Sequence, residues 1–200
     1  MSKRTILILA LVPALCLLSA CAKEAAPKNE IAPIELSAEQ QEIVDLLDFP
    51  DREILLFEHH TDDSFTEVEF WVEVYEYGQL VDRPSGIHAF ANESLSPVQG
   101  RLAVTISYGE ETQWSFTHSS GGGKITHRAS LRREGGLPGG RSYGPVHQAV
   151  EIEAGREIVL YACIFSDGGI SAMTDLQIYL EEPERLAGYP LVHLMKAKFS

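Results

Sequence analysis

A two-residue alternation of apolar and polar positions runs through the chain from Arg52 onward. Its clearest stretch places Val68, Phe70, Val72 and Val74 on one side and Glu67, Glu69 and Glu73 on the other. Successive side chains of a strand point to opposite faces of a sheet, so this pattern predicts a strand with one face in the core. We therefore expect Phe70 and Val72 to be buried, and Glu69 and Glu73 to be exposed.

The same alternation surrounds a turn between residues 102 and 118. Leu102, Val104, Ile106 and Tyr108 precede Gly109-Glu110-Glu111, and Trp114, Phe116 and His118 follow it. Two alternating runs joined by a short loop with glycine predict a β-hairpin. Its inward side would carry Trp114 and Phe116.

Further strands are predicted over residues 53–58, 124–131, 146–152, 157–165, 174–180 and 191–199. The run 158–165 is apolar at every position, which indicates a central strand covered on both faces. Short strands between Gly, Pro, Asn and Asp clusters are typical of antiparallel sheets. We therefore predict an all-β fold, an antiparallel β-sandwich over residues 50–200. The Cys-Trp-Cys framework of antibody domains is missing, so the expected likeness to an immunoglobulin domain is one of architecture only.

One helix is predicted ahead of the strands, over residues 37–49. Ser37 is a good N-cap, with Gln40 three positions later, and Pro50 ends the segment. Ile43, Val44, Leu46 and Leu47 form an apolar stripe on this helix. The fold is therefore expected to carry one short amphipathic helix at its N-terminal side.

The first residues have the three parts of an export signal. Lys3 and Arg4 are followed by an apolar run to Leu18, and the run closes with Leu18-Ser19-Ala20-Cys21. A membrane-spanning helix needs about 20 apolar residues, so the run is too short to span a bilayer. The segment resembles the signal peptides of bacterial lipoproteins. This resemblance implies that residues 1–20 are removed and that the Cys21 thiol receives diacylglycerol, with residues 21–36 as a lipidated tether.

The same resemblance implies a location. The protein would be extracytoplasmic and anchored by lipid in the cell envelope. Ala22 stands where inner-membrane lipoproteins typically carry aspartate. The expected place is therefore the outer membrane in a Gram-negative cell, or the cell surface in a Gram-positive one.

The charge of the chain limits its partners. The formal charge is −13, and without Lys3 and Arg4 the mature chain would carry −15. Binding to nucleic acid depends on excess positive charge, so we do not expect it. Of the three cysteines, Cys16 would leave with the signal and Cys21 would carry lipid. Cys163 would remain as a buried thiol without a disulfide partner.

Basic residues gather in one part of this acidic chain. Residues 112–150 contain Lys124, Arg128, Arg132, Arg133 and Arg141 but only one acid, Glu134. The stretch 133–145 is rich in glycine and is predicted to be a long mobile loop. Arg132, Arg133 and Arg141 could form an anion site there. Alternatively, they pair with acids of the strand at Glu67, Glu69, Glu73 and Glu76.

Two further groups of residues have both a functional and a structural interpretation. Trp71 and Tyr75 share a face with Glu73 and could hold a sugar or a peptide, or could be covered by the rest of the chain. His59, His60, Asp62 and Asp63 offer zinc ligands, but neighbouring strand residues point to opposite faces, and a turn after the first strand accounts for them without a metal.

No catalytic motif is present in the sequence. The Gly-x-Ser-x-Gly elbow and the phosphate-binding loop are both absent. We therefore predict a non-catalytic binding or structural module without a cofactor. Its partners would be the membrane, through the lipid, and an anionic small molecule, a glycan or an envelope protein. The alternative is an envelope hydrolase or a metal-binding protein that uses the region from His59 to Asp63.

Overall fold

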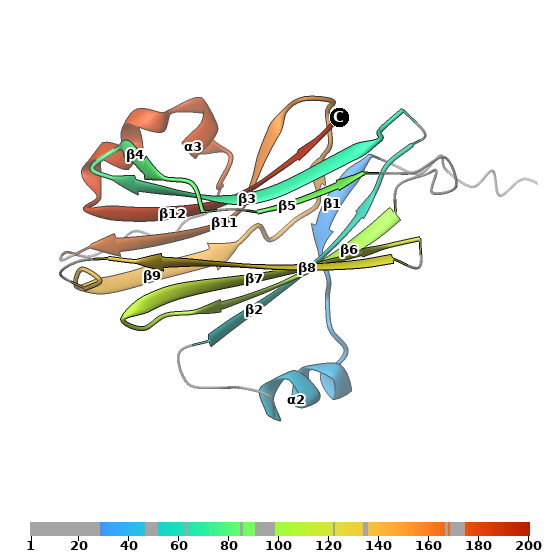
Figure 1. The fold of residues 1–200 in the computed structure, drawn as a ribbon, viewed down its shortest axis with the longest axis horizontal. Coiled ribbons are helices and arrows are strands. Elements are labelled where there is room, and N and C mark those ends of the chain that lie inside the picture. The colour runs from blue at the N-terminus through green and yellow to red at the C-terminus, as the bar shows by residue number, and fades with distance from the viewer. Residues whose placement is uncertain are drawn as a thin grey trace, which may run out of the picture.

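The computed structural model describes residues 29–46, 52–62, 64–84, 86–90, 99–121, 123–133, 136–166, 168 and 175–200. Two antiparallel sheets, A and B, each of six strands, make up most of this part. The sheets lie one above the other in Figure 1. The predicted all-β, antiparallel class is confirmed at this level. No helix in the described part of the chain is long and apolar enough to cross a membrane.

Sheet A has the strand order β10-β1-β2-β6-β7-β8. Its strands are β1 (Glu30–Pro33), β2 (Arg52–His60), β6 (Gln99–Ser107), β7 (Glu111–Ser120), β8 (Gly123–Arg132) and β10 (Val150–Glu151). The predicted hairpin is β6–β7, in which Ile106 lies opposite Trp114. Strand β8 continues this meander and forms one edge of the sheet.

Sheet B has the strand order β4-β3-β12-β11-β9, and β5 also pairs with β3. Its strands are β3 (Glu67–Glu76), β4 (Gln79–Asp82), β5 (Ile87–Phe90), β9 (Gly140–Pro145), β11 (Glu157–Ser166) and β12 (Leu191–Phe199). Tyr77 and Gly78 join β3 to β4 with φ angles of 46° and 79°. Positive φ at both residues is the geometry of a two-residue hairpin turn that follows the twist of the strands.

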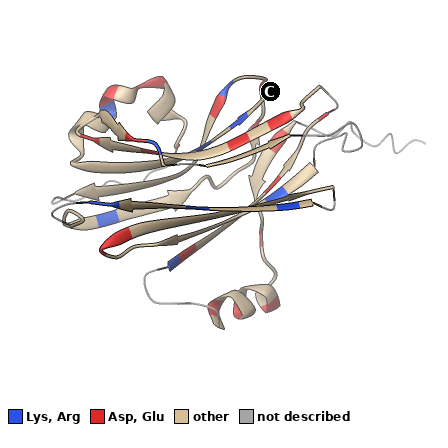
Figure 2. Cartoon of the chain, viewed as in Figure 1, with Lys and Arg blue, Asp and Glu red and all other residues tan. Residues whose placement is uncertain are grey.

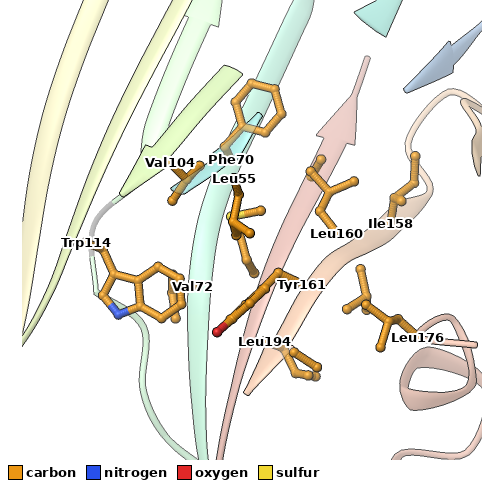
Figure 3. Packing of buried hydrophobic residues seen from close by; sticks show 14 of the residues in the cluster. Leu55, Phe70, Val72, Val104, Trp114, Ile158, Leu160, Tyr161, Leu176 and Leu194 are labelled. Carbon is orange, nitrogen blue, oxygen red and sulfur yellow. The ribbon is translucent and has the colours of Figure 1, made fainter. Parts of the chain in front are cut away.

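The core lies between the two sheets. Phe70 and Val72 from β3 and Trp114 and Phe116 from β7 are all fully buried, as predicted. Figure 3 shows Trp114 of sheet A beside Tyr161 of sheet B, and their ring centroids are 6.0 Å apart. The two inward faces therefore form a single hydrophobic cluster.

Strand β11 is covered on both faces, as its apolar sequence predicts. Each residue from Ile158 to Phe165 is at most 1% exposed. On the side away from sheet A, helix α3 (Ile178–Glu181) packs against the strand, and the 3-10 helix η2 (Pro183–Gly188) follows α3. The Gln177 side chain donates to the carbonyl of Val159 and accepts from its N–H at 2.8 and 3.1 Å. These bonds satisfy the backbone where the pairing of β11 with β12 is irregular.

The N-terminal helix is α2 (Ala38–Leu46). The Gln40 N–H donates to Ser37 Oγ at 3.3 Å, and the Ser37 N–H donates to Gln40 Oε1 at 2.9 Å, so the predicted capping pair forms. The rest of the predicted helix, residues 47–49, lies outside the described residues. Ile43 and Leu46 are 55% and 80% exposed. The apolar stripe of α2 therefore does not enter the core.

Several predicted segments differ in the structure. Residues 30–33, placed in the tether by the sequence, form β1 because their backbone pairs with both β2 and β10. Residues 140–145, predicted as mobile loop, form β9 because they pair with the edge of β11. The predicted strand 146–152 is reduced to Val150–Glu151. The predicted strand 174–180 is wrong, because residues Ile178–Glu181 form the helix α3 instead. Leu176, just before the helix, and Tyr179, within it, are both buried.

Candidate functional site

The aromatic face that the sequence offered for a sugar or a peptide is closed. Trp71 is 2% exposed and its Nε1 donates to Glu73 Oε1 at 3.1 Å. The Tyr75 hydroxyl donates to the other carboxylate oxygen at 2.6 Å. Arg83 stacks over the Trp71 ring at 4.5 Å. Trp71 and Tyr75 therefore hold a carboxylate of their own strand.

Glu73 is buried, and the prediction that it is exposed is wrong. It is 6% exposed, and Lys196 from β12 lies 2.6 Å from Glu73 Oε2. Burial alone raises the pKa of this carboxyl group. The hydrogen bonds from Lys196, Tyr75 and Trp71 and the charge of Lys196 outweigh that effect and leave the pKa of Glu73 below its ordinary value.

The three arginines proposed as an anion site lie in different surroundings. Arg133 Nε pairs with Glu76 Oε1 at 2.9 Å, which is the pairing that the sequence left open. Arg132 and Arg133 line one hollow of about 380 Å³, together with the acids Glu76 and Asp82. Arg141, on β9, stacks over the Tyr108 ring at 4.2 Å. The structure therefore does not bring the three guanidinium groups into one site.

The histidines and aspartates offered as metal ligands are also separated. His59 is fully buried and its Nε2 lies 2.9 Å from Nε2 of His118, so one of these nitrogens donates and the other accepts. His60 points to the opposite face, and Asp62 accepts hydrogen bonds from Asn29 and Ser64. Asp63 lies outside the described residues. Within those residues no group of three or more His, Cys, Asp or Glu side chains could hold a metal ion.

Gly100 explains how the histidine pair fits into the core. A Cβ at this position would lie 2.5 Å from His59 Nε2 and 2.6 Å from His118 Nε2. Such contacts are too short for any side chain. Glycine on the central strand β6 therefore allows the histidines of β2 and β7 to meet across it.

Cys163 is a buried thiol, as predicted. It is fully buried and makes no disulfide, and burial raises its pKa to about 12. Beside it, the Tyr161 hydroxyl donates to Glu53 Oε2 at 2.6 Å and lies 2.7 Å from the Tyr108 hydroxyl. A thiol with a raised pKa stays protonated at neutral pH and is a poor nucleophile.

The strongest concentration of cationic side chains lies on the side of sheet A that faces away from sheet B. We call this surface the basic face, and it comprises the outward side chains of β2, β6, β7 and β8. Its basic residues are Arg52, Arg101, Lys124, Arg128 and Arg132, and its acids are Glu58 and Glu111. Figure 2 shows blue bands along β8 and at the start of β2, whereas α2 carries red bands. A positive surface therefore lies on an acidic protein.

The strand register aligns these residues in rows. Glu58, Arg101, Ser119 and Lys124 lie side by side across four strands, and Arg128 lies opposite Ser115 in a second row. Apolar side chains on this face are Ile54 and Leu56 of β2 and Ala103 of β6. The other uncharged side chains between the charges of β6, β7 and β8 are polar. They are Thr105, Ser107, Gln113, Ser115, Thr117, Ser119, Thr126 and Ser130. The basic face therefore combines cations with hydroxyl and amide groups.

Two hollows open on this face. The first has a volume of about 520 Å³, and its lining includes Arg101, Lys124, His60 and Gln99. The second has a volume of about 640 Å³, and its lining includes Arg52, Arg128, Gln113 and Ser130. Within the described chain, none of the ion pairs involves Arg101, Lys124, Arg128 or Arg132. These four cations are therefore available to a ligand.

The sequence identified only one ligand residue of the basic face. Arg132 was proposed as a ligand residue, whereas Arg101, Lys124 and Arg128 were not. Lys124 and Arg128 lie four residues apart in the predicted strand 124–131, and Arg132 follows at the same interval just beyond its predicted end. In a continuous strand the three share one parity and one face. That spacing could have identified the β8 part of the site. The predicted lipid site Cys21 and the signal 1–20 lie outside the described residues.

The boundaries of the folded part agree with a family match. A family model described as the YgaN domain matches residues 30–199. The match begins at the first residue of β1 and ends at the last residue of β12. No curated protein and no solved structure matches the chain. Because the family model covers most of its length, the chain belongs to the YgaN domain family.

Proposed function

We propose that this protein is a lipid-anchored, extracytoplasmic, non-catalytic binding module that takes an anionic ligand on the basic face. The observation that carries the proposal is a set of four cations on one face, Arg101, Lys124, Arg128 and Arg132, that make no ion pair within the described residues. Three of them, Arg101, Lys124 and Arg128, line the two hollows of that face. An acidic chain has many carboxylates that could neutralise such residues, and Arg133 and Lys196 are indeed paired in this way. Four cations left open on one face favour an external anion, which they would attract and hold.

The anchoring part of the proposal is supported by the Leu18-Ser19-Ala20-Cys21 segment. The eight residues from Ala22 to Asn29 separate Cys21 from β1, and eight residues span at most about 28 Å. A lipid on Cys21 would therefore keep the domain close to the membrane surface. The expected location is the outer membrane of a Gram-negative cell, or the surface of a Gram-positive cell.

The fold part of the proposal is a β-sandwich of immunoglobulin-like architecture. Two antiparallel sheets that face each other over one hydrophobic cluster support it. The likeness concerns the two-layer arrangement and not the order of the strands.

Replacing Cys21 with serine should abolish lipid attachment, because serine has no thiol to accept diacylglycerol. The measurement is incorporation of radiolabelled palmitate in growing cells, followed by separation of membrane and soluble fractions. Cys16→Ser is the matched control, since Cys16 lies in the segment that would be removed. Equal labelling of the Cys21→Ser protein and its parent would show that the lipid is attached elsewhere.

Retention on a sulfonated resin tests the basic face. The protein, purified in a neutral detergent at pH 7, should bind at low salt despite its negative net charge, and should elute as salt rises because exposed charges are screened. The variant Lys124→Gln/Arg128→Gln/Arg132→Gln should flow through. The control Arg156→Gln/Arg185→Gln/Lys198→Gln removes the same charge from other surfaces and should still bind. Failure of the parent to bind, or equal behaviour of the two variants, would contradict the proposed site.

A further inference from the structure

The cations of the basic face are arranged along a line. Lys124, Arg128 and Arg132 point outward from β8 at intervals of four residues. A strand rises by about 3.3 Å per residue, so neighbouring cations are about 13 Å apart and the line is about 26 Å long. Arg101 lies two strands away from Lys124 in the same row, at a distance of about 10 Å.

The spacing of these cations favours a long ligand over a small one. Exposed charges are largely screened beyond about 10 Å at an ionic strength of 0.1 M. A small anion bound at Arg128 would therefore gain little from Lys124 or Arg132. A linear polymer with repeated negative charges could contact all three, and each contact after the first would form at a high effective concentration.

The surface between the cations is suited to sugar hydroxyls. One row of residues separates the two hollows, and within it the Thr117 and Thr126 hydroxyl oxygens lie 3.1 Å apart. Gln99 lines the first hollow and Gln113 the second. Hydroxyl and amide groups both donate and accept hydrogen bonds. They can therefore contact the uncharged hydroxyls of a polysaccharide as well as its acidic groups.

The same surface is poorly suited to a lipid bilayer. Proteins that bind a membrane by one face usually insert apolar or aromatic side chains below the headgroups. Among the large apolar side chains of the described residues that are exposed, only Ile54 belongs to the basic face, at 39% exposure. The polar side chains that surround the cations would gain nothing from the acyl region.

We infer that the ligand of the basic face is a linear acidic polysaccharide that lies along β7 and β8 and spans both hollows. This inference rests on the proposed function, because it requires that the basic face is the ligand site. The arginine side chains would hold the carboxylates of the polymer by paired hydrogen bonds. The serine, threonine and glutamine side chains would bind its hydroxyls.

Calorimetry with defined probes tests the inference on the full protein in a neutral detergent. The probes are polygalacturonate, monomeric galacturonate, inorganic polyphosphate and neutral dextran. Polygalacturonate should bind at least about a hundredfold more tightly than the monomer, because one chain reaches several cations. It should also bind more tightly than polyphosphate, which lacks sugar hydroxyls, and dextran should not bind.

Variants locate the polymer on the face. Arg101→Gln/Lys124→Gln removes two cations from the first hollow, and Arg128→Gln/Arg132→Gln removes two from the other end of the line. Each should weaken binding of long polygalacturonate at least about tenfold, because the polymer loses contacts at one end. Arg156→Gln/Arg185→Gln is the control with the same change of charge, and it should bind like the parent.

Other outcomes would overturn the inference in distinguishable ways. Equal affinity for polyphosphate and polygalacturonate, or for monomer and polymer, would refute a polysaccharide ligand and leave the anionic site in place. Stronger binding to phosphatidylcholine vesicles that contain phosphatidylglycerol than to pure phosphatidylcholine vesicles, without polygalacturonate binding, would indicate a membrane surface. The lipid anchor contributes equally to both kinds of vesicle. Retention on the sulfonated resin without binding to any of these probes would reject the polysaccharide alone, whereas loss of both would reject the proposed function as well.

Discussion

Replacing Phe70 with alanine should lower the free energy of unfolding by about 3–5 kcal/mol, as expected when a fully buried aromatic ring is removed from a core. Phe70 is 0% exposed. Its ring centroid lies 5.6 Å from that of His118 and 6.1 Å from that of Phe199. Loss of the ring would leave a cavity at the contact between the two sheets. A urea titration followed by tryptophan fluorescence measures the change.

Glu69→Ala is the control, because Glu69 is the preceding residue of β3 and its side chain points to the opposite face. It is half-buried and belongs to none of the ion pairs within the described ranges. Its replacement should change stability by less than about 1 kcal/mol. A Phe70→Ala loss no larger than the Glu69→Ala loss would contradict the burial of β3 against sheet A.

Alternation predicted the strands whose two faces differ. In β3 the inward residues are valine and phenylalanine, in β6 they are leucine, valine and isoleucine, and in β7 they include Trp114 and Phe116. These patterns are visible because burial of one face selects apolar residues at every second position. The continuous apolar run of β11 was equally informative, since a strand covered on both faces has no polar side.

Two strands that the sequence pattern did not predict, β9 and β1, form because their backbones pair with adjacent strands. Strand β9 contains Gly140, Ser142 and Gly144, which show no apolar alternation, and it becomes a strand because its backbone pairs with β11. Strand β1 has four residues and lies between two partners. Pairing of this kind depends on residues far along the chain, so local pattern cannot reveal it.

The candidate site also combines features that the local sequence reveals with features that only strand pairing creates. The parity of Lys124, Arg128 and Arg132 is a local property and places them on one face. Arg101 joins them only through the register of β6 with β7 and of β7 with β8. The prediction that Glu73 is exposed failed for the same reason, because its partner Lys196 comes from the neighbouring strand β12. An acidic residue was expected to face water, and the fold supplies a buried partner instead.

The Glu73 carboxylate has four polar neighbours from two strands and one loop. Trp71, Tyr75 and Lys196 lie within hydrogen-bond distance, and Arg83 Nη2 lies 3.4 Å from Oε1. Lys196 also contacts Glu157 at 2.9 Å. The side chains of Glu73 and Lys196 are each 7% exposed. A charge this deeply buried depends on its partners, because water cannot replace them.

Replacing Lys196 with methionine should therefore destabilise the protein by about 3–5 kcal/mol at pH 7, since it leaves the Glu73 charge buried without its main partner. Lys198→Met is the control on the same strand and face, with no ion pair among the described residues, and it should cost less than about 1 kcal/mol. The double change Glu73→Gln/Lys196→Met should recover much of the loss, because no unpaired carboxylate remains.

The pH dependence of this loss follows from the lowered pKa of Glu73 in the folded state. Stability from this group is present at neutral pH and disappears as the pH falls through that lowered value, so urea titrations at pH 7 and pH 3 should show the Lys196→Met loss shrinking in acid. A loss equal to that of Lys198→Met at both pH values would mean that the ion pair contributes nothing to the fold.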